Sequence, residues 1–193
     1  MKSIVLNIEA NGLKPDKIWC ITCLDLNTGE EHAFRRPDIS TESFLYFWRD
    51  VADVIVHNGI SYDCPNLCRL IDRELFVEKR VVDTLVISRL LDYSRAGGHS
   101  LAAWAPVVGV EKTVQPPWDE FSEALVDHSM QNCRITAALY RTFLPYLNSP
   151  RWQPAIETEM KVQTYLQQMH ENGFYLDIDK VKELRYNILR EVE

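Results

Sequence analysis

Polar side chains that could act on one substrate are spread over three parts of the sequence. Asn7 and Glu9 lie two residues apart in an apolar, β-branched run, so in a strand they point to the same face. His128 and Asn132 lie four residues apart in a helical pattern and share one face of that helix. Asp63 follows a turn between a predicted strand and a predicted helix. If the first strand is central, these groups converge on one cleft, where solvent at a sheet edge or a metal ion could satisfy them.

Hydrophobic periodicity places these side chains on an α/β framework. The predicted strands are residues 3–9, 18–26, 31–35, 54–57 and 81–82. The predicted helices are residues 41–51, 65–75, 83–91, 100–109, 123–143, 154–171 and 179–193. Ser40 or Thr41 is expected to cap the first helix and Asp83 the third, and Pro106 is expected to kink or shorten the fourth. We therefore expect a mixed five-stranded sheet flanked by helices, in which an antiparallel meander is followed by parallel strands.

A cluster of turn-forming residues near position 148 predicts a boundary. Pro145 and the sequence Asn148-Ser149-Pro150 interrupt the helical pattern. We predict a first domain at residues 1–147 and a linker segment at residues 148–193. The two helices of this segment carry apolar stripes, and Gly173 ends the first of them. Together they predict a C-terminal helical hairpin that is too small to fold alone.

Composition narrows the class of protein. The chain has 193 residues, of which 46% are hydrophobic and 25% charged, as is typical of a soluble globular protein with one core and an appendage. Its formal charge of −7 argues against a protein that coats duplex nucleic acid through bulk electrostatics. No apolar run predicts a membrane span, and the N-terminus lacks the pattern of a signal peptide. Cys20 and Cys23 fall on opposite faces of one predicted strand, so we interpret them as plain thiols rather than a metal pair, which fits a reducing cytoplasm.

Short motifs in a fixed order carry a resemblance to a known family. They are Asn7-Ile8-Glu9, Asn58-Gly59-Ile60-Ser61-Tyr62-Asp63, and the stretches 83–90, 118–132 and 169–177. The first two resemble the Asp-x-Glu and Asn-x(2–3)-Tyr-Asp motifs of the 3′-5′ exonuclease (DEDD) superfamily, and His128 to Asn132 resembles its Tyr-x-x-x-Asp motif. Over nearly its whole length, the chain is similar to the proofreading domain of a bacteriophage-type family A DNA polymerase. The resemblance implies a ribonuclease-H-like fold, which agrees with the expected sheet.

The resemblance also implies a metal-dependent 3′-5′ exodeoxyribonuclease domain of a DNA-directed DNA polymerase. Two Mg²⁺ or Mn²⁺ ions would clamp the scissile phosphate, one generating hydroxide and the other stabilising the leaving 3′ oxygen. The residue at position 7, here Asn7, would bridge both ions. Glu9 and position 132 would hold the ion beside the nucleophile, and Asp63 would act on the second ion through water. His128 would orient or deprotonate the attacking water.

Contacts with DNA follow from the same resemblance. Leu13 matches a residue that wedges against the terminal base, and Asn58 and Tyr62 would line the path of the strand. The expected partners are a single-stranded DNA 3′ end, held by sequence-tolerant stacking, and a polymerase domain in cis or in trans. The products would be nucleoside monophosphates. The expected location is the host cytoplasm if the gene belongs to a phage, and no membrane partner is expected.

Three positions depart from the family pattern. His128 stands where the third motif has tyrosine, and Asn7 and Asn132 stand where the family has aspartates. An amide offers one weaker oxygen and an N–H₂ group that repels a cation, so we predict little or no hydrolysis by this sequence. Either the two amides were introduced to silence an enzyme, or the chain is a naturally inactive module that grips a single strand or serves as a scaffold. A free-standing nuclease of small oligonucleotides is a third interpretation, against which the polymerase-like tail argues.

Overall fold

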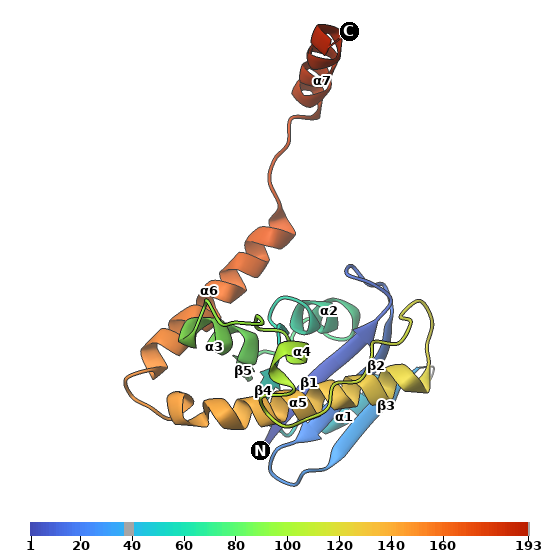
Figure 1. The fold of residues 1–193 in the computed structure, drawn as a ribbon. Helices are drawn as coiled ribbons and strands as arrows, with labels where there is room; N and C mark the ends of the chain where they lie inside the picture. Colours follow the sequence, from blue (N-terminus) through green and yellow to red (C-terminus); the bar gives the residue numbers. More distant parts are fainter. Residues whose placement is uncertain (37–40, 193) are drawn as a thin grey trace.

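The computed structural model contains a five-stranded sheet in the order β3-β2-β1-β4-β5 (Figure 1). The structure describes residues 1–36 and 41–192. The strands are β1 (Lys2–Ala10), β2 (Ile18–Asp25), β3 (Glu31–Arg35), β4 (Val51–Val56) and β5 (Arg80–Asp83). β2 is antiparallel to both β1 and β3, whereas β4 lies parallel to β1 and β5 parallel to β4. The predicted mixed sheet is confirmed, and β1 is its central strand.

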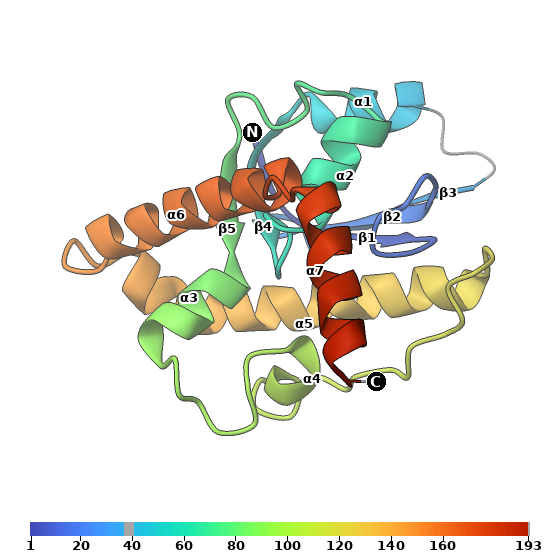
Figure 2. The ribbon, with the colours of Figure 1, turned by 90° about the horizontal axis from the view of Figure 1, so that it is seen from above.

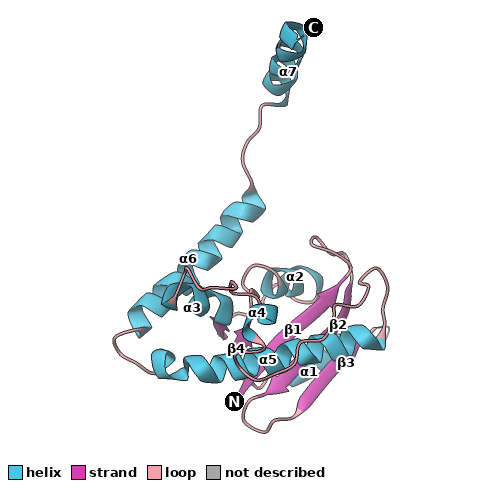
Figure 3. Ribbon diagram, viewed as in Figure 1, coloured by secondary structure: helices cyan, strands magenta, loops and turns pink. Residues whose placement is uncertain are grey.

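Helices cover both faces of this sheet (Figures 1 and 3). They are α1 (Thr41–Trp48), α2 (Asp63–Leu70), α3 (Thr84–Leu91), α4 (Leu101–Trp104), α5 (Glu123–Leu147), α6 (Gln153–Asn172) and α7 (Ile178–Val192). α5 lies across one face, against β1, β2 and β4, and α1 and α2 pack on the other. Within the two described ranges, no helix combines the length and the apolar character needed to cross a membrane.

The central strand divides two hydrophobic cores. Ile4, Leu6 and Ile8 alternate onto the face that α1 and α2 cover. Val5 points to the opposite face and packs in the core under α5. By the same alternation, residues 7 and 9 share the face of Val5. The two polar side chains of β1 therefore interrupt the apolar surface beneath the long helix.

Two predicted helix boundaries in the first half of the chain are wrong. The first helix ends at Trp48 rather than near Val51, because Val51 is already the first residue of β4 and is buried there. The second runs from Asp63 to Leu70, not from residue 65 to 75. It stops early because the following turns bury Leu75 under Trp48, whose Nε1 donates to the Leu75 carbonyl over 2.6 Å. The Ser40 cap lies outside the described residues.

Two proline positions act differently from each other. α4 ends at Trp104, so Pro106 shortens the helix as predicted. α5 instead continues through Pro145 to Leu147, past the predicted end at residue 143. Proline removes one helical hydrogen bond, but Leu147 is 5% exposed and packs in the core. Tertiary packing therefore outweighs the local cost at this site.

Both predicted C-terminal helices are present, but they are not packed against each other. The first half of α6 lies beside α3 and contributes Ile156 and Met160 to the core under α5 (Figure 2). Gly173 ends α6 with a φ of 65°, as predicted. Residues 173–177 then lead α7 away from the rest of the molecule (Figure 1). The apolar stripe of α7, including Leu184 and Ile188, is exposed, so the predicted hairpin is open in this structure.

Candidate active site

The backbone of β1 holds the side chain of Asp63 near the carboxyl end of that strand. Among the described strands, β4 pairs with β1 only as far as Val5, so the next N–H groups on that edge need another acceptor. The N–H of Ile8 donates to Asp63 Oδ1 over 2.9 Å. The carboxylate of Asp63 thus completes the sheet edge between Asn7 and Glu9, as the sequence led us to expect for a central first strand.

A second buried carboxylate, Asp83, builds the turn that leads to Asp63. The N–H groups of Asn58 and Ile60 donate to Asp83 over 2.8 and 3.1 Å. Asp83 also caps α3, as predicted, by accepting from the N–H of Leu85 over 2.9 Å. Asn58 has a φ of 63°, which reverses the chain after β4. The ends of β4 and β5 therefore fix the entry to α2.

Asn7 faces α5. Its Nδ2 donates to Ser129 Oγ over 2.8 Å, and that hydroxyl lies 2.7 Å from Thr22 Oγ1 on β2. The amide nitrogen is therefore turned into the protein. This contact seats β1 against the part of α5 that carries His128 and Asn132.

Lys112 joins His128 and Asn132, which share one face of α5 as predicted. Lys112 Nζ donates to Asn132 Oδ1 over 2.6 Å and lies 3.0 Å from His128 Nε2. The other ring nitrogen, His128 Nδ1, lies 2.7 Å from Thr113 Oγ1. The Lys112 charge also interacts with Glu9. The five predicted site residues therefore form one cluster, with an ammonium group inside it.

The two carboxylates of this cluster are hard to ionise because Asp63 is buried and Glu9 is partly buried. Burial raises the pKa of Asp63 to about 7, and the nearby charges of Asp83 and Glu9 add to the effect, against a hydrogen bond from the backbone. Burial also raises the pKa of Glu9, while a hydrogen bond from Gln115 and the charge of Lys112 oppose it. Such a pair of desolvated acids favours a neighbouring cation.

The ring of His128 is neutral at physiological pH. Burial and then the charge of Lys112 lower the pKa of His128 to about 4. Burial lowers the pKa of Lys112 as well, although Glu9 opposes this. A neutral ring that accepts from Lys112 at Nε2 must donate from Nδ1, so Thr113 is the acceptor of that hydrogen bond.

Replacing Lys112 with methionine should raise the pKa of His128 from about 4 toward 6.5, because the ammonium is removed while part of the burial remains. An NMR titration of the imidazole ring measures this shift. Lys180→Met, at an exposed position of α7, is the matched control and should leave the titration unchanged. An unaltered His128 titration in Lys112→Met would contradict the placement of the ammonium beside the ring.

The residues predicted to contact DNA lie near the cluster but not inside it. Leu13 is 83% exposed on the loop between β1 and β2. The hydroxyl of Tyr62 donates to the Gly12 carbonyl over 2.7 Å and so ties this loop to α2. Burial raises the pKa of Tyr62 to about 12. Asn58 is exposed in the turn before α2. These positions suit a rim around the cluster, and their contact with DNA stays a prediction.

The segment between α4 and α5 contributes residues that sequence reasoning missed. Lys112 and Thr113 contact His128, and Gln115 Nε2 lies 3.5 Å from Glu9 Oε2. Residues 110–117 have no helical or strand periodicity, so no pattern predicts which of their side chains turn inward. The only available signal is that Lys112 is the single lysine between residues 80 and 160.

The donors of the cluster do not fit a pair of divalent cations. Asn132 Oδ1 is hydrogen-bonded to the Lys112 ammonium, and Asn7 turns its amide nitrogen toward Ser129. Across residues 1–36 and 41–192, no three His, Cys, Asp or Glu side chains gather as metal ligands. Because an amide is a weak ligand for Mg²⁺, the cluster as it stands holds its own cation rather than a ligand set for two metals.

A protein-family model matches the part of the chain that forms the sheet. The RNase_H_2 model, of the RNase_H superfamily, matches residues 4–116, which is more than half of the chain. The chain belongs to the RNase_H superfamily. The match includes Asn7, Glu9, Asp63 and Lys112 and ends before α5. The predicted ribonuclease-H-like fold is thereby confirmed.

Two phage proteins are relatives in sequence. A DNA-directed DNA polymerase of Enterobacteria phage T3 is 25% identical over 241 aligned residues, which cover 94% of this chain and 34% of the relative. The corresponding protein of Escherichia phage T7 is 26% identical over 243 residues, with the same coverage. The chain spans about a third of the length of these curated relatives. The predicted resemblance to phage DNA polymerases is confirmed along nearly the whole chain.

Solved structures share the fold. The family B DNA polymerase of the archaeon Pyrobaculum calidifontis superposes with a TM-score of 0.63 and 16% identity, over 89% of this chain and 29% of that one. NrnC of Brucella melitensis, solved with bound Mg²⁺, gives a TM-score of 0.60 and 13% identity, over 91% and 89% of the two chains. At these identities the likeness concerns the fold alone.

Proposed function

We propose that this chain is the 3′-5′ proofreading exonuclease domain of a phage DNA polymerase, in a form that binds a single-stranded 3′ end without hydrolysing it. The observation that carries the proposal is the convergence of Asn7, Glu9, Asp63, His128 and Asn132 at the carboxyl end of β1. The phage relatives, whose name is DNA-directed DNA polymerase, support the polymerase context.

The two amides account for the proposed lack of hydrolysis. With aspartates at positions 7 and 132, four carboxylates would surround the site and would suit Mg²⁺ or Mn²⁺. With Asn7 and Asn132, half of that negative charge is absent, and the neighbouring Lys112 supplies a positive charge. The proposal is the same whether the amides are natural or were introduced.

Contacts around the cluster would select a frayed end. Lys112 would attract the terminal phosphate, because its ammonium is the cation of the cluster. Leu13, exposed on its loop, would press against the terminal base, and Asn58 and Tyr62 would line the approach. A duplex end would have to unpair before it could reach these residues.

The C-terminal segment would connect this domain to a polymerase domain. We propose residues 1–147 as the exonuclease-type domain and residues 148–193 as the connection, although α6 shares the core of the first part through Ile156. The exposed apolar stripe of α7 would pack on the polymerase domain, in cis or in trans. Such a phage protein would act in the host cytoplasm.

Binding of fluorescent oligonucleotides tests the proposal. We expect the chain to bind a single strand at least about tenfold more tightly than a blunt duplex of the same length, a difference of ~1.4 kcal/mol. A strand whose 3′ end is closed into a hairpin should behave as the duplex does, because its end is not free. Equal affinity for all three, or no binding to the single strand, would refute the proposed function.

A further inference from the structure

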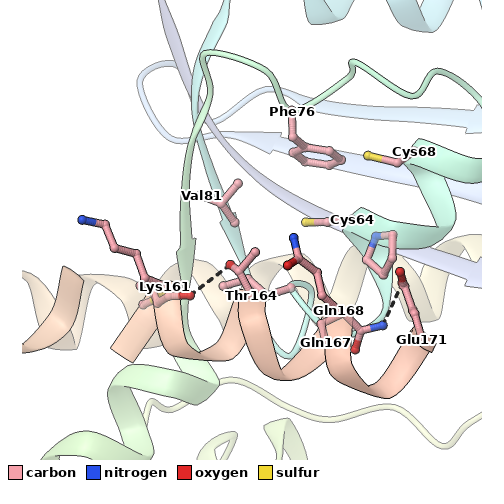
Figure 4. A pocket seen from close by; sticks show the side chains of 12 residues that line it. Cys64, Cys68, Phe76, Val81, Lys161, Thr164, Gln167, Gln168 and Glu171 are labelled. Carbon is pink, nitrogen blue, oxygen red and sulfur yellow. Dashed lines mark hydrogen bonds between the residues drawn. The ribbon is translucent and has the colours of Figure 1, made fainter. Parts of the chain in front are cut away.

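Two adjoining cavities separate α2 from the second half of α6. One has a volume of about 400 Å³ and is mostly apolar; Figure 4 shows Cys64, Cys68 and Phe76 around it. The other has a volume of about 740 Å³ and reaches the loop between β1 and β2. Cys68 and Gln167 line both cavities, so the two adjoin, and together they are called the depression below.

Cations surround the larger cavity, in a chain whose formal charge is −7. Lys14, Arg69 and Arg73 line it beside His170, against one acid, Glu171. Arg69 is engaged in the structure, since it donates to the Pro15 carbonyl over 2.5 Å and to Asn66 over 2.9 Å.

Lys14 and Arg73 are the cations free to bind a ligand. Both side chains are exposed, and neither has a hydrogen-bond or ion-pair partner among the described residues. Glu171, the opposing acid, accepts a hydrogen bond from Gln167 over 3.1 Å. The β1–β2 loop, which carries Lys14, and the turns after α2, which carry Arg73, therefore offer two unpaired positive charges to an anion.

The larger cavity borders the loop that carries Leu13 and the turn that leads to Asp63. Leu13 and Ser61 line its wall, and the residues next to Ser61 are Tyr62 and Asp63 of the site. Tyr62 also holds the loop of Leu13 in place through the Gly12 carbonyl. A strand whose end lies at Asp63 would pass Leu13 and enter this depression.

We propose that the two cavities hold one nucleotide of the single strand a few positions before its 3′ end. Lys14 and Arg73 bind the phosphate, and the base enters the apolar cavity, where it escapes water and contacts the ring of Phe76. Only an unpaired base can turn into such a cavity, so this subsite selects single strands. The inference rests on the proposed function and assigns a second contact to the same strand.

Phosphate binding is tested by Arg73→Ala in the full chain, with Arg151→Ala as the control. Arg151 is exposed between α5 and α6, away from both cavities, so the control removes the same charge elsewhere. Arg73→Ala should weaken binding of a fluorescent single strand by about tenfold, as one charge-assisted hydrogen bond predicts. It should also lower the salt dependence of log K by about 0.7, the value for one phosphate on a single strand.

Binding of the base is tested by moving one abasic nucleotide along the oligonucleotide. A single position, a few nucleotides before the 3′ end, should be sensitive. An abasic nucleotide there should lower the affinity by about fivefold or more, as expected for a base held on an aromatic ring. In Arg73→Ala, this sensitivity should shrink, because the phosphate no longer positions the base.

The outcomes separate the inference from the function on which it rests. If the unaltered chain binds no single strand, both are refuted. If it binds single strands, but Arg73→Ala equals Arg151→Ala or no abasic position is sensitive, the subsite is refuted and the proposed function stands.

Discussion

Asn7→Asp combined with Asn132→Asp is expected to convert an inert chain into one that shortens a single strand from its 3′ end. The two substitutions add two negative charges beside Glu9 and Asp63 while keeping the shape of each side chain. Metal ions contribute several kcal/mol of charge stabilisation in such sites, and each 1.36 kcal/mol changes the rate tenfold. We therefore expect an increase of at least about 10³-fold over the unaltered chain.

The measurement is a ladder of shortened products from a 5′-labelled oligonucleotide in Mg²⁺ or Mn²⁺. Each single restoration should remain well below the double variant, because each leaves one amide in the cluster. Adding Glu9→Gln to the double variant should abolish the ladder, and so should a chelator. A folded double variant that binds single strands but does not shorten them with either metal would contradict the proposal that this site is a nuclease site.

Short-range patterns predict which side chains share a face better than they predict the helix ends. Asn7 and Glu9 share a face because strands alternate, and His128 and Asn132 share a face because helices repeat every 3.6 residues. These rules involve only neighbouring residues, so they hold without knowledge of the fold. The end of α2 and the extension of α5 through Pro145 depend on which side chains find the core, and no local rule contains that information.

The contacts that organise the site are long-range, and this is why the sequence could not specify them. Asp63 accepts from Ile8 because β4 stops pairing with β1 at Val5, which is a property of the assembled sheet. Lys112 meets His128 because an irregular segment crosses the face of α5. A resemblance can indicate that Asp63 belongs to the site, but only the structure gives its hydrogen bond and the ammonium that neighbours the cluster.

Asp63→Asn is expected to stabilise the folded chain at pH 8 by as much as about 4 kcal/mol. Burial raises the pKa of Asp63 from 3.8 to about 7, so the folded state binds this proton more tightly than the unfolded state does. The contribution of Asp63 to the free energy of unfolding is therefore highest below about pH 4 and falls as the pH rises through 7, by 1.36 kcal/mol for each unit of pKa difference. Asparagine stays neutral, and its Oδ1 can still accept from the N–H of Ile8.

Urea unfolding of both proteins between about pH 4 and pH 8 measures this difference. The advantage of Asp63→Asn should be small near pH 4 and grow with pH, whereas Asp127→Asn, at an exposed position of α5, should show no such growth. A difference that does not change with pH would contradict the raised pKa of Asp63. In the doubly restored chain, Asp63→Asn should abolish hydrolysis while the protein stays folded. These two results together would show that the carboxylate of Asp63 serves the reaction and not the fold, because stability alone would favour asparagine at this position.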